Sequence, residues 1–238
     1  LVGRGPGLPG AGSRGCLVWW LGSLAIGGTT WSPAGREGLI GEQFREGLAC
    51  VRVRPEMRIA FRLAFSVAGL GAVLAFSLAA GIADDLFARG GGGLGVLSMS
   101  LGVGSLLASA FISGRGGRMS RSVLERRSVL LYGAGLVVVA SSSWLGVGMF
   151  GYLLMGGAHM LHGTTLSTSL QLRVDEEFRG RVMSVFLVSI LSGIPIGGLV
   201  FGILGDLIGL RWVVLGAGLA LCVDAVVTGR RGAFDLLD

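Results

Sequence analysis

The side chains best suited to chemistry form a stripe within an uncharged stretch, residues 128–172. On a helix its members share one face, because they recur three or four positions apart: Met155, His159, His162, Thr165 and Ser169. Histidine exchanges a proton near neutral pH, and ionisable groups inside a bilayer usually face protein or a watery cavity. The stripe therefore predicts a substrate or proton path, with candidate residues His159, His162, Thr165 and Ser169. The alternative is a pair of histidines hydrogen-bonded to neighbouring helices.

Metal and cofactor sites are not favoured by the same residues. Two histidines with no carboxylate or thiol on their face lack a third metal ligand. Gly146-x-Gly148-x-x-Gly151 matches a dinucleotide-binding fingerprint as a string, but that fingerprint needs a preceding strand and a soluble βαβ unit. No ATP-binding motif is present. We expect no metal and no cofactor.

The elements that must position the stripe are membrane spans. Hydrophobic residues make up 52% of the 238 residues, charged residues only 14%, and the mean hydropathy is +0.75. About 20 apolar residues in a helix cross a bilayer. The stretch 128–172 is about twice that length, so it must hold two helices, with a break near 146–148. With the other uncharged stretches this predicts six spans in an all-α membrane protein: 63–83, 90–114, 182–205 and 212–229.

Arginine placement predicts the orientation of these spans. Every second connection is basic, and such connections lie in the cytoplasm, so both ends of the six-helix block should be cytoplasmic. The net charge of +6 is explained by these connections and does not indicate a nucleic-acid partner. The basic connections contain Arg52, Arg54, Arg58 and Arg62; Arg115, Arg118, Arg121, Arg126 and Arg127; Arg173, Arg179 and Arg181; and Arg230 and Arg231.

Four segments follow from this pattern. Residues 1–38 are a poorly defined N-terminal segment, interpreted as the end of a preceding transmembrane helix. Residues 39–58 place apolar side chains at helical spacing between charges, which predicts an amphipathic linker on the cytoplasmic surface. Residues 59–231 form the six-helix transmembrane half-domain, and residues 232–238 form a cytoplasmic tail.

The fifth span is rich in small residues at four-residue spacing. Such residues let helix backbones approach closely, and the enclosed proline removes one backbone hydrogen bond and permits a kink. We expect either static packing or a helix that bends or slides during function. The residues are Gly193, Pro195, Gly197, Gly198 and Gly202.

The connection between the fourth and fifth spans carries a family resemblance. Residues 171–186, Gln-Leu-Arg-Val-Asp-Glu-Glu-Phe-Arg-Gly-Arg-Val-Met-Ser-Val-Phe, resemble the loop between the tenth and eleventh helices of major facilitator superfamily transporters. The likeness is to the bacterial exporters related to the enterobactin exporter, and residues 45–55 look like the linker into the seventh helix of that subgroup. One departure lies in 114–127, which keeps the basic residues of the family's Gly-x-x-x-Asp-Arg-x-Gly-Arg motif but lacks its Asp.

The resemblance implies that residues 39–231 are the C-terminal half of a twelve-helix transporter, built from two inverted three-helix repeats. Its implied partners are the lipid bilayer, a small-molecule substrate and an N-terminal six-helix half. It implies efflux by alternating access across the bacterial inner (plasma) membrane, driven by an ion gradient, with protons the expected ion. The span count and the start at Leu1 suggest a fragment. It also implies candidate gate residues in the cytoplasmic loops: Arg115, Arg118, Arg179, Gly180 and Arg181.

Two alternatives remain at this point. A non-transporting membrane scaffold or a decayed half-gene fits a chain with only six spans. An intramembrane serine protease fits the span count and the histidines, but it needs Gly-x-Ser-Gly, and here Phe111 and Ile190 occupy the glycine position before Ser113 and Ser192. We therefore expect a transporter and not an enzyme.

Overall fold

The computed structural model of the chain describes residues 49, 51, 54–114, 116 and 119–238, and these residues form helices and no strand. The N-terminal segment, most of the expected linker, Arg115 and Arg118 lie outside the described residues. The helices are α3 (Pro55–Ser66), α4 (Ala79–Gly81), α5 (Gly90–Gly114), α6 (Arg121–Ser141), α7 (Leu145–Arg173), α8 (Glu176–Ile208) and α9 (Leu210–Arg230). Two π-helical segments, η1 (Val67–Ser77) and η2 (Ile82–Leu86), flank α4, and a 3₁₀ helix, η4 (Ala233–Leu237), follows α9.

The first helical segment begins at Pro55, where a proline is well suited because its missing N–H has no partner in a first turn. Residues 55–58, the last part of the expected linker, therefore lie in α3. The helix widens into η1 after Ser66, and Tyr132 of α6 packs there against Gly71, where an added Cβ would lie 2.7 Å from the ring. This π-helical stretch has no counterpart in the sequence pattern.

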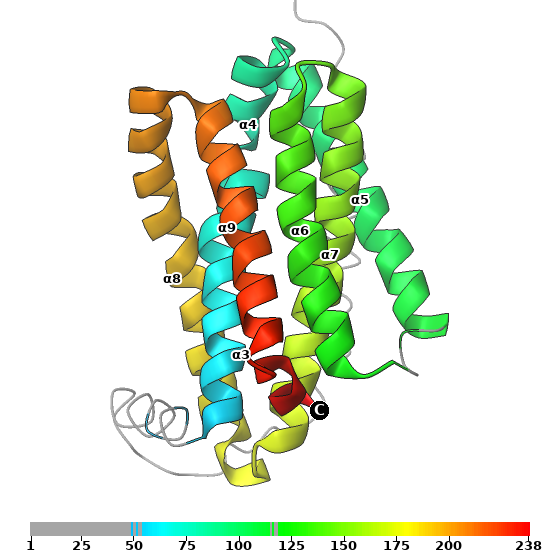
Figure 1. The fold of residues 1–238 in the computed structure, drawn as a ribbon, viewed down its shortest axis with the longest axis vertical. Helices are drawn as coiled ribbons and strands as arrows, with labels where there is room; N and C mark the ends of the chain where they lie inside the picture. Colours follow the sequence, from blue (N-terminus) through cyan, green and yellow to red (C-terminus); the bar gives the residue numbers. More distant parts are fainter. Residues whose placement is uncertain (1–48, 50, 52–53, 115, 117–118) are drawn as a thin grey trace, which may run out of the picture. The chain divides into compact units, whose positions relative to one another are not determined.

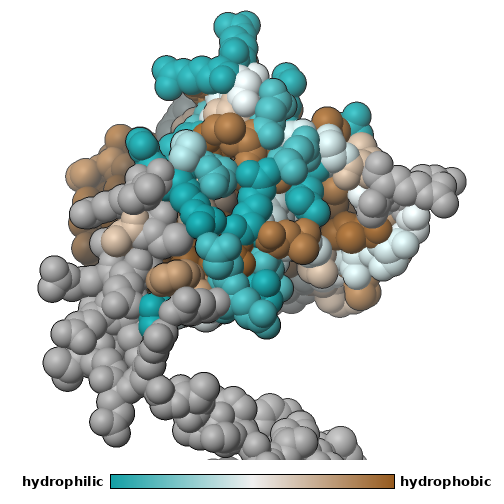
Figure 2. Space-filling model, turned by 90° about the horizontal axis from the view of Figure 1, so that it is seen from below, coloured by the Kyte–Doolittle hydropathy of each residue, from teal (hydrophilic) through white to brown (hydrophobic). Residues whose placement is uncertain are grey.

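The helices run up and down, and the arginine-rich connections meet at one end of the bundle (Figure 1). The start of α3, the end of α5, the start of α6, the α7–α8 connection and η4 lie at this end, which we call the basic end. The opposite end holds α4, η2 and the short turns at 142–144 and Gly209. Hydrophilic residues lie across the middle of the basic end, and hydrophobic residues lie toward its sides (Figure 2).

Four helical segments among the described residues are long and apolar enough to cross a membrane: Pro55–Ser77, Gly90–Gly114, Phe178–Ile208 and Leu210–Arg230. The remaining two long helices are less apolar. The first two turns of α6 contain Arg121, Glu125, Arg126 and Arg127, and α7 is rich in glycine and hydroxyl side chains. The break between α6 and α7 falls at 142–144, and the expected break near 146–148 is wrong because Gly146 and Gly148 lie in the first turn of α7.

Close backbone contacts hold α5, α6, α7 and α9 together. A Cβ added to Gly104 of α5 would lie 2.0 Å from the Leu153 carbonyl oxygen of α7, and one added to Gly133 of α6 would lie 2.7 Å from the Gly218 carbonyl oxygen of α9. Only glycine permits these approaches, as in other membrane helix pairs.

Helix α8 packs along one stripe and leaves most of its surface outside. Gly193 and Gly197 face η1, and a Cβ on Gly197 would lie 2.5 Å from the Gly69 carbonyl oxygen. Gly198 and Gly202 have nothing within 4 Å of an added Cβ. In the most apolar part of this helix, only 6% of the residues are buried inside the bundle. Pro195 is exposed within the continuous helix, so the small residues of the fifth span divide between a packed and an open face.

Candidate functional site in the helix bundle

A buried carboxylate and a buried imidazole face one another between α6 and α7. His162 Nδ1 lies 2.7 Å from Glu125 Oε1, the Glu125 residue is 0% exposed and His162 is 6% exposed. Either the imidazole N–H donates to the carboxylate, or a protonated carboxyl donates to the ring nitrogen. A protonated carboxyl beside a neutral imidazole and a carboxylate beside an imidazolium contain the same number of protons, and in both the pair is neutral overall. With one proton fewer, the pair carries one negative charge inside the bundle, so gain and loss of a proton change its buried charge.

The carboxylate is held by its own helix. Ser128 Oγ donates to the Glu125 carbonyl oxygen at 2.7 Å and lies 3.4 Å from Oε2. Ser122 and Tyr132 lie on the same buried face of α6. Ser122, Glu125, Ser128 and Tyr132 are three, three and four positions apart, which is the same helical spacing as the stripe on α7.

Sequence reasoning missed Glu125 because the residue stands among arginines and was counted with a surface connection. The polar stripe on α6 was the signal that could have found it. A carboxylate does therefore meet the histidine stripe, but it comes from the facing helix.

The predicted stripe on α7 forms a largely buried face. Met155, His162, Thr165 and Ser169 are buried, and His159 is half-buried. The His159 ring makes edge contacts with Tyr132 at 6.1 Å and with Phe76 at 5.2 Å between ring centroids. Five buried polar atoms make no hydrogen bond within the described residues, and four of them lie on α6 and α7: Tyr132 Oη, Tyr152 Oη, His159 Nδ1 and Ser169 Oγ. Buried polar groups are normally hydrogen-bonded, so several unpaired polar atoms on α6 and α7 distinguish this part of the bundle from an ordinary packed interior.

A cavity of about 380 Å³ approaches the pair from the basic end. Its wall includes Leu124, the neighbour of Glu125, and Thr165, one turn along α7 from His162. Most of its lining surface is apolar, with hydroxyl side chains, Arg121 and Asp238 among the lining residues. The lining residues are Ile112, Gly116, Met119, Ser120, Arg121, Leu124, Thr164, Thr165, Thr168 and Asp238.

Asp238 closes one side of this cavity and caps α6. Its carboxylate accepts hydrogen bonds from the Ser122 backbone N–H at 3.1 Å and from Ser122 Oγ at 2.5 Å. Burial acts to raise the pKa of the Asp238 carboxyl, but the hydrogen bonds from Ser122 and from the Arg121 backbone, with the Arg121 charge, lower that pKa below its ordinary value. Phe234 and Leu237 are buried, so the expected tail at 232–238 folds onto the bundle.

The candidate gate residues that the structure describes lie in the first turns of α8. Arg179 and Gly180 are exposed, and the Arg181 guanidinium lies 5.4 Å from the centre of the Phe178 ring. The preceding connection is only Val174 and Asp175. They are therefore helical residues at the basic end and are not part of a long loop.

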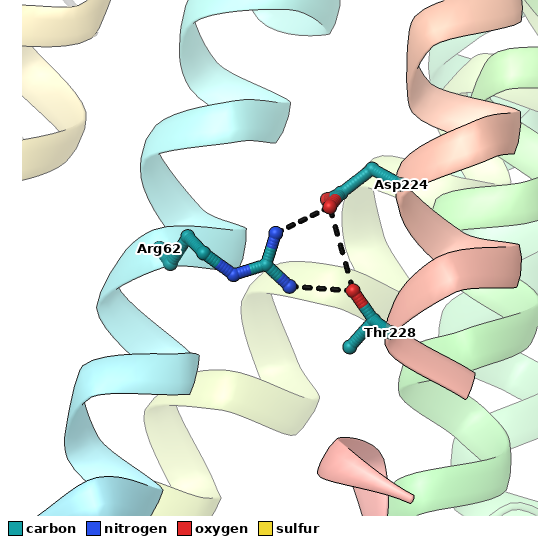
Figure 3. A network of polar contacts seen from close by, with 3 residues as sticks. All are labelled: Arg62, Asp224 and Thr228. Atoms are coloured by element: carbon teal, nitrogen blue, oxygen red, sulfur yellow. Dashed lines mark hydrogen bonds and ion pairs between the residues drawn. The ribbon is translucent and has the colours of Figure 1, made fainter. Parts of the chain in front are cut away.

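Two polar contacts at the basic end were not foreseen. Arg54 donates to the Arg173 carbonyl oxygen at 3.0 Å and to Asp175 at 2.9 Å, which joins the start of α3 to the α7–α8 connection. Arg62 of α3 pairs with Asp224 of α9 and donates to Thr228 Oγ1, which itself bonds Asp224 (Figure 3). Asp224 lies within the last expected span, and Arg62 gives its carboxylate a cationic partner.

The comparisons with known proteins give one family. The model for transmembrane secretion effectors, a family of major facilitator type, matches residues 20–232. No curated protein and no solved structure matches the chain significantly.

Proposed function

Because the chain belongs to the transmembrane secretion effector family, of major facilitator type, we propose that it acts in the gradient-driven export of small molecules by alternating access. In this proposal residues 59–231 are the C-terminal six-helix half of the transporter, in a bacterial inner membrane, with the basic end in the cytoplasm. The family match over most of the chain is the observation that carries it.

The helix arrangement supports the assignment as a half. The segment from α3 to α6 and the segment from α7 to α9 each supply three long helical passes, as two repeats of opposite orientation would. The exposed apolar surfaces of α5 and α8 suit contact with lipid and with a second, N-terminal bundle. An alternating-access transporter needs such a second bundle, because one half moves against the other.

The Glu125–His162 pair supplies the coupling chemistry in this proposal. A proton entering from the basic end would pass the threonine-lined cavity, whose wall includes neighbours of the pair, and would convert the pair from a net negative charge to a neutral one. Exchange of that proton with the other side of the membrane would tie substrate movement to a proton gradient. Ionisable groups buried in spans commonly form such relays.

Transport in vesicles tests this proposal. The chain, coexpressed with a matching N-terminal half, should move substrate when a proton gradient is applied, and Glu125→Gln should abolish the dependence of that flux on the gradient. Glu176→Gln is the matched control, because it removes a carboxyl group from the exposed start of α8. His162→Ala should weaken the flux or change its pH dependence. A Glu125→Gln variant that couples normally would exclude the pair, whereas no flux in any variant would exclude the transporter itself.

A further inference from the structure

Two adjoining cavities lie at the basic end, one along α3 and one between α3 and α9. One, of about 340 Å³, is lined by Pro55, Arg58, Ile59 and Arg62. The other, of about 290 Å³, is lined by Ile59, Arg62, Val227, Thr228, Arg231 and Ala233. Both cavities are lined by Ile59 and Arg62, so they adjoin at these two residues, and we call them together the recess.

Three arginines border this recess, but their charges are balanced differently. Arg62 is neutralised by Asp224 and held in place by Thr228 (Figure 3). Arg58, one turn earlier on α3, and Arg231, at the end of α9, make no ion pair within the described residues. The carboxylates nearest in sequence, Glu56 and Asp235, line neither cavity. Among the described residues, the recess therefore presents two guanidinium groups that have no carboxylate partner.

The surfaces beside the recess are apolar and exposed. On α3, Phe65 is 46% exposed, and on α9 Val223 is 60% exposed. Val226 and Val227 continue this surface toward the recess. In a membrane-spanning chain these side chains contact lipid acyl chains, so an anion held by Arg58 and Arg231 would have hydrocarbon beside it.

We propose that this recess binds the phosphate group of an anionic phospholipid, with the phosphate between Arg58 and Arg231 and the acyl chains along α3 and α9. Guanidinium groups suit phosphate because their planar donors form paired, charge-assisted hydrogen bonds. Basic pockets between membrane helices are typical binding places for anionic headgroups. Arg62 acts as a positioning residue, since its contacts with Asp224 and Thr228 hold α3 and α9 at the spacing that the headgroup bridges.

Native mass spectrometry of the purified full chain, titrated with palmitoyl-oleoyl phosphatidylglycerol, tests the proposal. We expect saturable binding that is weakened about tenfold or more in Arg58→Gln/Arg231→Gln, because each arginine near a lipid surface contributes on the order of 1 kcal/mol. The matched control is Arg127→Gln/Arg230→Gln, which removes the same charge from exposed arginines at the same end that line neither cavity. The single variants Arg58→Gln and Arg231→Gln should each give part of the loss.

The source of the phosphate is decided by two further probes. Palmitoyl-oleoyl phosphatidylcholine carries the same phosphate without net negative charge and should bind more weakly. Glycerol 3-phosphate should not displace phosphatidylglycerol; equal competition would assign the site to a soluble phosphate and overturn the lipid. Binding that is equal in the Arg58/Arg231 and the control variants would overturn the site, and circular dichroism confirms that each variant is folded.

Discussion

Glu125 is completely buried, and its contact with His162 is what makes the burial of a carboxyl group energetically acceptable. A buried carboxylate without a partner is strongly unfavourable, whereas a hydrogen-bonded pair can be close to neutral in stability. The Glu125–His162 pair therefore adds little to the overall free energy of unfolding, and its presence points to a chemical role. Each side chain therefore lowers the free-energy cost of burying the other.

This dependence predicts a strong coupling in a double-mutant cycle. Glu125→Gln and His162→Gln should each lower the free energy of unfolding, and the double variant should lose less than the sum by at least about 1 kcal/mol, because contacting residues are not additive. Thermal unfolding of the chain in detergent measures the effect. Glu176→Gln with His159→Gln is the control, since Glu176 lies at the exposed start of α8, remote from the α6–α7 interface, and should add within about 0.5 kcal/mol. Additive behaviour of Glu125 and His162 would argue against a shared proton.

At the scale of helices, small residues decide how near the elements approach. The α5–α7 contact depends on Gly104, whose backbone lies against the Leu153 carbonyl, while Gly102, half a turn away, faces open space. The two glycines therefore have different reasons to be present, and only one is required by packing.

Gly104→Ala should destabilise the bundle by about 1–3 kcal/mol, because a Cβ there forces α5 away from α7. Gly102→Ala places the same methyl group where nothing lies within 4 Å and should be neutral or slightly stabilising. The thermal unfolding midpoints of the two variants give the comparison. Equal midpoints would mean that α5 and α7 are not in close contact.

Much of the helical architecture could be predicted, because apolar length and charge are direct signals. The buried face containing His162 follows from spacing alone. The α6–α7 turn lies a few residues before the glycines at which the sequence predicted it. The location of Glu125 could not be read from charge, since a carboxylate among arginines looks like a surface residue until the facing helix is known. Likewise, the partner of Asp224 is 162 residues away in the chain, and no local pattern reports such a contact.

For the whole molecule, the collection of basic connections at one end indicates a single orientation in the membrane. The same end carries the mouth of the threonine-lined cavity, the start of α8 and the arginine recess. Proton entry, the candidate gate and lipid binding would therefore all occur at the same membrane surface.

Site-directed labelling tests this orientation. In a background without Cys16, Cys50 and Cys222, Ser120→Cys should react with a membrane-impermeant thiol reagent only from the cytoplasmic side, and Asp85→Cys only from outside. Asp85 lies in η2 at the opposite end, and both positions are at helix ends. Labelling of Ser120→Cys from outside would reverse the assignment.

The contact of Arg54 with Asp175 and the Arg173 carbonyl has a mechanical consequence. It links the start of α3 to the connection between α7 and α8, and Arg54 and Asp175 are 121 residues apart in the sequence. The two side chains are 36% and 68% exposed, so dissolved ions screen this fastening far more than the glycine contacts deeper in the bundle. A higher salt concentration therefore weakens this contact between α3 and the α7–α8 connection, and it leaves the glycine contacts among α5, α6 and α7 unchanged.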